Sequence, residues 1–281
     1  MNYVKTFILL FTLTLLLIWV GSMFGGPRGA MIAFIFALVL NLGSYWFSDK
    51  IILTMYKAKE VSKNEAPELY SIVEDLIIDA KLPMPKVCIV AQKVPNAFAT
   101  GRDPNHAAVC VTEGILGLLT EDELKGVLAH ELAHIKNRDT LIMTIAATVA
   151  GAIMMLASMA RWAAIFGGFG GRDRNRGGSV FGLIAIAIFA PLAAMIVQLA
   201  ISRTREYAAD KRGAHFAHSA QGLASALKKL DSAAKKHRMP ASPQTAHLFI
   251  VNPLRGDFLA TLFSTHPPVE KRVERLESLK I

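Results

Sequence analysis

The chain has 281 residues, of which 53% are hydrophobic and 19% charged, and its formal net charge is +9. Its mean hydropathy of +0.38 is high for a soluble domain, whose apolar share is typically about 45–50% even with glycine counted. Two cysteines, Cys88 and Cys110, do not suggest a disulfide framework, and we expect both to be buried thiols. Nucleic acid is a poor fit as a partner, because most aromatic residues lie in apolar runs rather than among the basic ones.

Four runs without charged side chains account for the high hydropathy: residues 6–27, 29–48, 140–160 and 177–202. Each meets the requirement of roughly 20 apolar residues for a helix that crosses a bilayer. A backbone in hydrocarbon must satisfy its own hydrogen bonds, so we expect all four runs to be helical. Buried core helices of a large soluble protein are the alternative, but the chain is short for four of them.

The first run has features of a signal peptide, because Lys5 precedes the apolar stretch FILLFTLTLLLIWV. The following GSMFGG lacks a small-residue cleavage site, and a second apolar run begins almost at once. We therefore predict an uncleaved transmembrane hairpin over residues 1–48.

Polar segments at residues 49–139 and 203–281 flank a second hydrophobic hairpin, at residues 140–202, and together they are expected to form one mainly helical α+β domain. In the first segment, helical spacing covers Pro67–Ala80. The runs KVCIV and AAVCV read as strands, and NAFATG between them reads as an extended segment. Another helix is predicted after Thr120, which forms a capping box with Glu123.

The motif HELAH places His130 and His134 four residues apart on that helix. At this spacing both imidazoles leave one helix face and can share a Zn²⁺ ion at about 2.0–2.1 Å. Glu131 lies about a quarter turn away, where it can reach a water on the metal without binding the metal itself. An amphipathic helix with two incidental histidines is the alternative, and the intervening glutamate argues against it.

A catalytic zinc needs a third protein ligand and an open position. A third histidine six residues after His134 is excluded, because position 140 is threonine. Glu206 in SRTREYAAD would complete the ligand set, and Asp210, one turn later, could accept the second N–H of a ligand imidazole. The alternatives are that both acids are surface charges, or that the later pair His215 and His218 supplies the ligand.

Four stretches, HELAHIKNRD, EYAAD, NAFATGRDPNHAAVCVTEGIL and STHPPVEKRVERL, resemble the HtpX family of bacterial heat-shock membrane zinc proteases, which are relatives of the CAAX prenyl endoproteases. The resemblance covers nearly the whole chain. It implies one zinc ion per chain on His130, His134 and Glu206, with Glu131 as the general base and Asp210 as a partner of the ligands. It also implies that His266 and Arg272 bind substrate or stabilise the oxyanion.

The resemblance further implies that the segment of Asn96, Ala97, Phe98 and Ala99 belongs to an edge strand that pairs with an extended peptide. The expected fold is then an integral membrane protein with about four transmembrane helices and a zincin-like (gluzincin) protease domain. Residues 49–139 and 203–281 would form that domain, split by the second hairpin. The expected substrates are misfolded or damaged membrane proteins. A prenyl-CAAX-type endoprotease and a membrane metal-binding protein without turnover are the alternatives.

The distribution of basic residues predicts the orientation. Both termini and both polar segments lie on one side of the bilayer if each hairpin crosses it twice. The basic residues expected near the span ends on that side are Lys5, Lys50, Lys57, Lys59, Lys63, Lys125, Lys136, Arg138, Arg203, Arg205, Lys211 and Arg212. Only Arg28, Arg172, Arg174 and Arg176 lie opposite, with Arg161 at the border. The positive-inside rule then places the catalytic domain in the cytoplasm, on a multi-pass protein of the bacterial inner membrane. The basic stretch 228–238 fits either an anionic leaflet or a solvated helix face.

Overall fold

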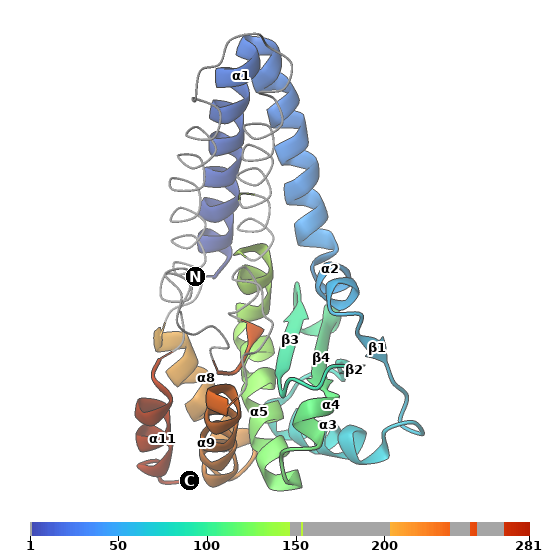
Figure 1. Ribbon diagram of the computed structural model, residues 1–281, viewed down its shortest axis with the longest axis vertical. Helices are drawn as coiled ribbons and strands as arrows, with labels where there is room; N and C mark the ends of the chain where they lie inside the picture. The colour runs from blue at the N-terminus through green and yellow to red at the C-terminus, as the bar shows by residue number, and fades with distance from the viewer. Residues whose placement is uncertain (1, 147–152, 154–202, 237–247, 252–266) are drawn as a thin grey trace.

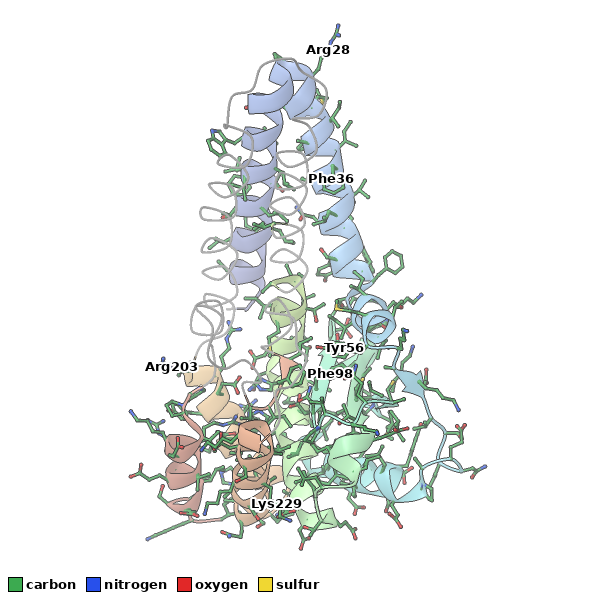
Figure 2. The ribbon with its side chains drawn as sticks, viewed as in Figure 1. Arg28, Phe36, Tyr56, Phe98, Arg203 and Lys229 are labelled. Atoms are coloured by element: carbon green, nitrogen blue, oxygen red, sulfur yellow. The ribbon has the colours of Figure 1, made fainter. Side chains whose placement is uncertain are left out.

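A computed structural model describes residues 2–146, 153, 203–236, 248–251 and 267–281. A long helical hairpin stands on a domain in which one small sheet packs against a group of helices (Figure 1). Both chain ends of the helical hairpin point toward this domain, and its tip, labelled at Arg28, is the most distant point from it (Figure 2).

The hairpin is α1, Asn2–Trp46, which contains two helices joined at Gly26. Gly26 has φ 55° and ψ −144°, a conformation that ends the first helix, and Pro27 begins the second, where its missing N–H costs no hydrogen bond. The two helices meet closely at Gly21 and Gly29: a Cβ atom on Gly29 would lie 2.1 Å from the carbonyl oxygen of Gly21. Small residues permit this contact between helices, as they do in membranes.

Within the described residues, one helix is long and apolar enough to cross a membrane, Gly25–Trp46, and Leu10–Trp19 is a shorter apolar helix. The apolar side chains of Gly25–Trp46 are exposed, as on a lipid-facing surface; Ile32 and Val39 expose 69% and 65% of their area. The two apolar runs predicted at residues 6–27 and 29–48 correspond to the two helices of α1, and the chain reverses at Gly26–Pro27. The second predicted hairpin, residues 140–202, lies outside the described residues except for 140–146 and 153.

The sheet has the strand order β1-β2-β4-β3. Its strands are β1 (Lys59–Glu60), β2 (Lys86–Val90), β3 (Ala97–Gly101) and β4 (Ala107–Thr112). β2 and β4 run parallel, and β3 is antiparallel to β4 at one edge. Cys88 and Cys110 are register partners on β2 and β4, and both are free and buried, as predicted.

Helices cover the sheet, and one of them carries the HELAH motif. They are α2 (Ser48–Met55), α3 (Pro67–Ala80), α4 (Glu113–Leu116), α5 (Glu121–Asn137), α8 (Arg203–Phe216), α9 (Gln221–Lys236) and α11 (Val269–Glu277), with the short 3₁₀ helix η1 (Pro104–His106). The predicted helix at Pro67–Ala80, the two strands and the capping box at Thr120 are confirmed.

α5 forms the centre of the domain, packed against β3 on one side and against α8, α9 and α3 on the others. Its buried leucines, Leu124, Leu128 and Leu132, belong to the main core together with the inner residues of the sheet and of α9. The basic stretch of α9 faces neighbouring helices and solvent: Lys228 contacts Glu277 at 2.8 Å and Lys229 contacts Glu123 at 2.7 Å. These contacts favour the solvated helix face over contact with a leaflet.

Candidate active site

The two motif histidines project from α5 into the interior of the domain. His130 and His134 are 2% and 3% exposed, and their Nε2 atoms lie 3.2 Å apart. The helix that carries them is fixed at its start by the capping box, in which Glu123 accepts a hydrogen bond from the backbone N–H of Thr120 at 2.9 Å. The local sequence therefore determines where the helix begins, and the i, i+4 spacing places the two imidazole nitrogens on the same face of it.

Glu206 reaches the same point from α8. Its carboxylate oxygens lie 3.8 Å from Nε2 of His130 and 3.6 Å from Nε2 of His134. The approach depends on Gly213, where a Cβ atom would lie 2.8 Å from the backbone nitrogen of His130. A larger residue at this position would push α8 away from α5 and so withdraw Glu206 from the histidines.

These three side chains fit a zinc ion. The two Nε2 atoms are 3.2 Å apart, and each has one oxygen of Glu206 within 3.8 Å. One ligand atom from each residue lies within 4.8 Å of the others, a spacing that a single zinc ion with bonds of about 2.0–2.1 Å can bridge. Nδ1 of His130 lies 2.9 Å from Asp210, and Nδ1 of His134 lies 3.3 Å from Asp139. When these carboxylates take the Nδ1 protons, the two Nε2 atoms are left free to bind one cation.

Electrostatics around the pair also favour a cation. Burial alone would lower the pKa of His134, but its hydrogen bond to Asp139 and the charges of Glu206 and Glu131 raise this pKa to about 9. A pocket that draws a proton this strongly onto an imidazole attracts a divalent ion for the same reason. Two imidazole nitrogens and one carboxylate oxygen form a donor set suited to catalytic zinc.

Asp210 is held in place by Arg272, which is fully buried. The guanidinium donates from Nε to one carboxylate oxygen at 2.9 Å and from Nη2 to the other at 2.6 Å. A further nitrogen, Nη1, donates to the carbonyl of Ile250 at 3.0 Å. Burial would raise the pKa of Asp210, but Arg272 and His130 hold this pKa at about 2. Asp210 therefore remains a carboxylate that orients the imidazole of His130.

Asp139 holds His134 in a corresponding way, a role that the motif does not reveal. α5 ends at Asn137, Arg138 takes a left-handed conformation with φ 58°, and helical structure resumes at residue 139. This break turns the Asp139 carboxylate back toward His134, so the motif helix does not continue unbroken into the apolar run. Arg205 of α8 lies 3.7 Å from the other oxygen of Asp139. The sequence feature that could have revealed this role is an acidic residue five positions after the second histidine.

Glu131 is 6% exposed and lines the same cavity as the ligands. Burial raises its pKa, while the neighbouring histidines and a backbone hydrogen bond from Ala99 of β3 act in the opposite direction. Its position beside the ligands suits Glu131 to exchange protons with a water at the metal centre.

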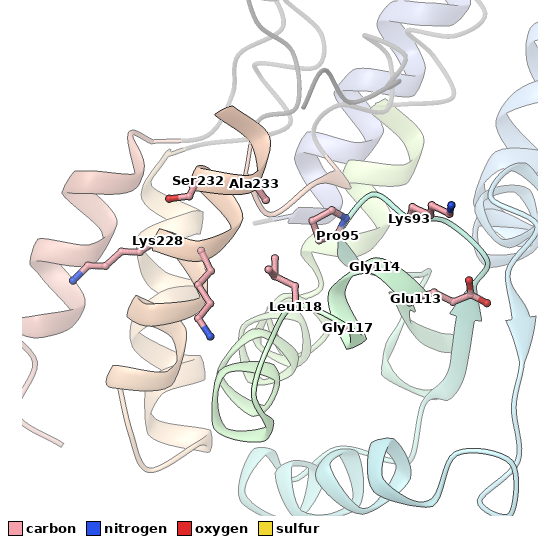
Figure 3. Close-up of a pocket in the computed structure, with 10 residues that line it drawn as sticks. Lys93, Pro95, Glu113, Gly114, Gly117, Leu118, Lys228, Ser232 and Ala233 are labelled. Atoms are coloured by element: carbon pink, nitrogen blue, oxygen red, sulfur yellow. The ribbon is translucent and has the colours of Figure 1, made fainter. Parts of the chain in front are cut away.

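The cavity at this centre is almost closed. Leu248, Phe249 and Ile250 cover it, and the remaining space of about 20 Å³ holds about one water. Asn96 fixes the cover from both sides, since its amide nitrogen donates to the carbonyl of Leu248 at 3.2 Å and its amide oxygen accepts from the N–H of Ile250 at 3.2 Å. A larger cavity of about 880 Å³ lies between α9 and α4 (Figure 3), and none of the three ligands lines it.

The remaining predicted residues are placed as follows. Ala97, Phe98 and Ala99 lie in β3, at the edge of the sheet, and Asn96 directly precedes it. His266 lies outside the described residues. The competing ligands are remote from the metal centre: His218 is exposed and contacts Asp79 at 3.0 Å, and His215 is exposed as well. Within the described part of the chain, His130, His134 and Glu206 form the one cluster able to hold a metal.

A glutamate beside two zinc-binding histidines on one helix, with the third ligand on a second helix, defines a zinc metalloendopeptidase. The sequence model of peptidase family M48 matches residues 63–280. "Protease HtpX homolog" of Syntrophobacter fumaroxidans is 57% identical over 279 residues, 98% of each chain. The homolog of Syntrophotalea carbinolica is 57% identical over the whole of both chains, and that of Thermococcus kodakarensis is 54% identical over 99% of this chain and 96% of its own.

The chain therefore belongs to peptidase family M48 and, within it, to the HtpX membrane proteases. Its fold is also similar to a solved structure described as "Crystal Structure of S. mikatae Ste24p". The TM-score is 0.53 at 19% identity, over 98% of this chain and 66% of the other. That likeness concerns the fold alone, whereas the HtpX relatives named above match in sequence over 96–100% of their length.

Proposed function

We propose that this protease cleaves misfolded or damaged membrane proteins, as part of protein quality control under stress. We also propose that it is a multi-pass protein of the cell membrane, the inner membrane in a bacterium, with its catalytic domain in the cytoplasm. The observation that carries the proposal is the connection between the zinc centre and the membrane hairpin. Thr140 donates to the carbonyl of Gly101 at the end of β3 at 2.9 Å, and the next residue, Arg102, donates to the carbonyl of Trp46 at 3.1 Å.

In this proposal, an extended segment of substrate pairs with β3 at the edge of the sheet. The outer edge of an edge strand offers backbone donors and acceptors that bind a peptide largely independently of its sequence. All residues of β3 are buried in this structure, so this edge must first be uncovered. β3 runs from Ala97, which follows Asn96 near the cover of the site, to Gly101, at the membrane end of the domain. A loop or tail that leaves the bilayer can therefore align with β3 and pass the zinc centre. Leu248–Ile250 must move aside, because the present cavity does not admit a peptide.

Zinc, when bound, supplies Lewis acidity that activates a water and polarises the scissile carbonyl. Glu131 accepts the proton of the attacking water and then donates it to the leaving amine, so the base of the first step is the acid of the second. Asp210 and Asp139 keep the two imidazoles in the tautomer that leaves Nε2 free to bind metal. His266 is proposed to face the developing oxyanion. For Arg272 the contacts favour a positioning role through Asp210, because its guanidinium is engaged by that carboxylate and by Ile250.

The substrate class can be tested with the zinc-loaded full chain in lipid nanodiscs. Two substrates with the same extended tail sequence are compared. In one the tail is attached to a transmembrane helix in the same nanodiscs, and in the other it is a free peptide at equal concentration. We expect faster cleavage of the anchored tail, no cleavage after chelation, and recovery on adding zinc. Equal rates for both forms would contradict the membrane-substrate proposal while leaving the peptidase activity intact.

Orientation can be tested by labelling single cysteines in intact cells with a membrane-impermeant maleimide. Arg28 lies at the hairpin tip, and Lys57 follows Tyr56, which lies beside the catalytic domain (Figure 2); both can be replaced by cysteine. The native Cys88 and Cys110 are 1% and 0% exposed, so they contribute little background. Labelling at position 28 alone is expected. Labelling at position 57 alone would place the catalytic domain outside the cell.

A further inference from the structure

A second cavity, of about 450 Å³, lies where the membrane hairpin joins the catalytic domain. Segments far apart in the sequence form its wall: the end of α1, the start of α2, the residues just before and within β2, and the turn between β3 and β4. The lining residues that matter for binding are Trp46, Phe47, Asp49, Lys50, Lys86 and Arg102. It has no residue in common with the zinc centre or with the covering segment Leu248–Ile250.

Its position corresponds to the surface of the bilayer. The helix Gly25–Trp46 has 22 residues and is therefore about 33 Å long, close to the roughly 30 Å thickness of a hydrocarbon core. Trp46 and Phe47 at its end expose 54% and 51% of their area. Exposed aromatic rings at the end of an apolar span mark the depth of the lipid headgroups, where tryptophan is enriched.

The charged lining is mainly basic. Lys50, Lys86 and Arg102 carry three positive charges against the one negative charge of Asp49. Lys50 lies 5.5 Å from the centre of the Phe47 ring, and the contact of Lys86 with Glu60 is long, at 3.8 Å between exposed groups. Both ammonium groups therefore keep donors available. Asp103 does not line the cavity, and its carboxylate accepts hydrogen bonds from the backbone N–H groups of its own turn.

Arg102 is held in a fixed orientation. Its guanidinium lies over the Trp46 ring, 5.0 Å from the centroid, and Nη1 donates to the carbonyl of Trp46 at 3.1 Å. Nε lies 3.5 Å from Asp103, and the side chain is 19% exposed. A guanidinium fixed in this way, with donors remaining, suits a phosphate group, which it can bind through two oxygens.

We propose that this cavity binds the phosphate headgroup of an anionic phospholipid, with Arg102 and Lys50 as the main contacts. Arg102 directly follows Gly101, the last residue of β3. The bound headgroup joins the membrane end of this strand to Trp46 and fixes the height of the catalytic domain above the bilayer. The inference rests on the cavity and its charges and is independent of which proteins the enzyme cleaves.

The test compares variants that each remove one positive charge, in the zinc-loaded full chain. Arg102→Gln and Lys50→Gln change the cavity, and Lys57→Gln, two residues after α2, removes a charge outside it. Retention of phosphatidylglycerol and of phosphatidylcholine from mixed micelles is measured by native mass spectrometry. Nonspecific attraction to an anionic surface contributes about 1 kcal/mol per basic residue, a factor of about five, wherever that residue lies near the membrane. We expect Arg102→Gln to weaken phosphatidylglycerol binding at least tenfold and Lys57→Gln fivefold or less.

Equal losses for the cavity variants and Lys57→Gln would overturn the proposal, as would equal retention of the two lipids by the unaltered protein. Soluble glycerophosphoglycerol and inorganic phosphate distinguish the lipid from a free phosphate. If either displaces the lipid at millimolar concentration, the site binds a soluble anion and the proposal fails. If Arg102→Gln fails to fold, Lys50→Gln still tests the cavity. Lys50 makes one ring contact and no ion pair within 4 Å among the described residues, so its replacement should not disturb the fold. Zinc content and Tm should be unchanged in each variant used.

Discussion

Arg272 offers a test of how the zinc centre is built. A role in oxyanion stabilisation, implied by the family resemblance, predicts a loss of kcat at unchanged zinc affinity. The contacts indicate instead that Arg272 positions Asp210, since two of its nitrogens bind that carboxylate at 2.9 and 2.6 Å. Asp210 in turn lies 2.9 Å from Nδ1 of His130. Replacing Arg272 should therefore change metal binding through this chain of contacts.

The magnitude follows from the geometry of the pair. Lysine cannot reproduce a bidentate contact, and methionine leaves Asp210 as an unpaired buried charge, which typically costs about 3–5 kcal/mol of stability. Loss of a carboxylate that orients a ligand histidine lowers metal affinity about 10–100-fold, equivalent to about 1.4–2.8 kcal/mol. We expect Arg272→Lys to lower zinc affinity by this factor. Arg272→Met should lower zinc affinity as well and should also unfold at a lower temperature.

The assay is competition for zinc against a chromophoric chelator, followed by kcat measured at saturating zinc. Arg275→Lys is the matched control, because Arg275 lies on the same helix but stacks on the Tyr207 ring, 3.7 Å from its centroid, at the surface. If Arg272 acts through Asp210, the variant Asp210→Asn and the double variant should lose similar zinc affinity, well short of the sum of the single effects. Unchanged zinc affinity with a kcat lowered 10²–10³-fold, the usual cost of an oxyanion donor (about 2.7–4 kcal/mol), would refute the positioning role.

Four further substitutions have definite expected outcomes. Glu131→Gln should keep one zinc per chain and lose cleavage, and a retained rate would remove Glu131 as the base. Asp139→Asn should lower zinc affinity about 10–100-fold, measured by chelator competition. Asn96→Ala removes both side-chain hydrogen bonds to the covering segment, so kcat/KM for peptides should rise; a fall would make Asn96 a substrate ligand. Burial would raise the pKa of Glu123, but Lys229 and Ser225 lower it from 4.5 to about 2. Glu123→Gln should therefore lower stability by about 1–2 kcal/mol at pH 7, with the difference in Tm fading as pH falls from about 4.5 to 2.

Features encoded by neighbouring residues were predictable from the sequence. The helix Pro67–Ala80, the two strands and the HELAH face depend on periodicity and capping over fewer than twenty residues. Glu206 could be reached by a different argument, because a catalytic zinc requires a third ligand and few acids remain after the second apolar hairpin. The need for a third zinc ligand limited the candidate residues, although Glu206 lies 72 positions after His134 in the sequence.

Features that depend on tertiary contacts could not be predicted in the same way. The bond between Arg272 and Asp210 joins residues 62 apart, and Asn96 meets the covering segment over a separation of more than 150 residues. The periodicity of a sequence carries no information about which distant side chains will form a hydrogen bond. The helix break at Arg138 was also hidden, since left-handed residues are usually glycine or asparagine and an arginine gives no such signal. That break accounts for the missed role of Asp139.

The charges buried around the zinc centre explain why its partners must act together. Glu131, Asp139, Glu206 and Asp210 are each 6% exposed or less, and four buried carboxylates are costly unless they are compensated. Arg272 supplies one positive charge in direct contact, and Arg205, at 3.7 Å from Asp139, supplies another. When both histidines are neutral, as metal binding requires, and all four acids are ionised, two negative charges remain, which is the charge that a divalent ion neutralises. Zinc therefore completes an electrostatic balance that spans α5, α8 and α11, and so metal binding and the packing of these helices should be coupled.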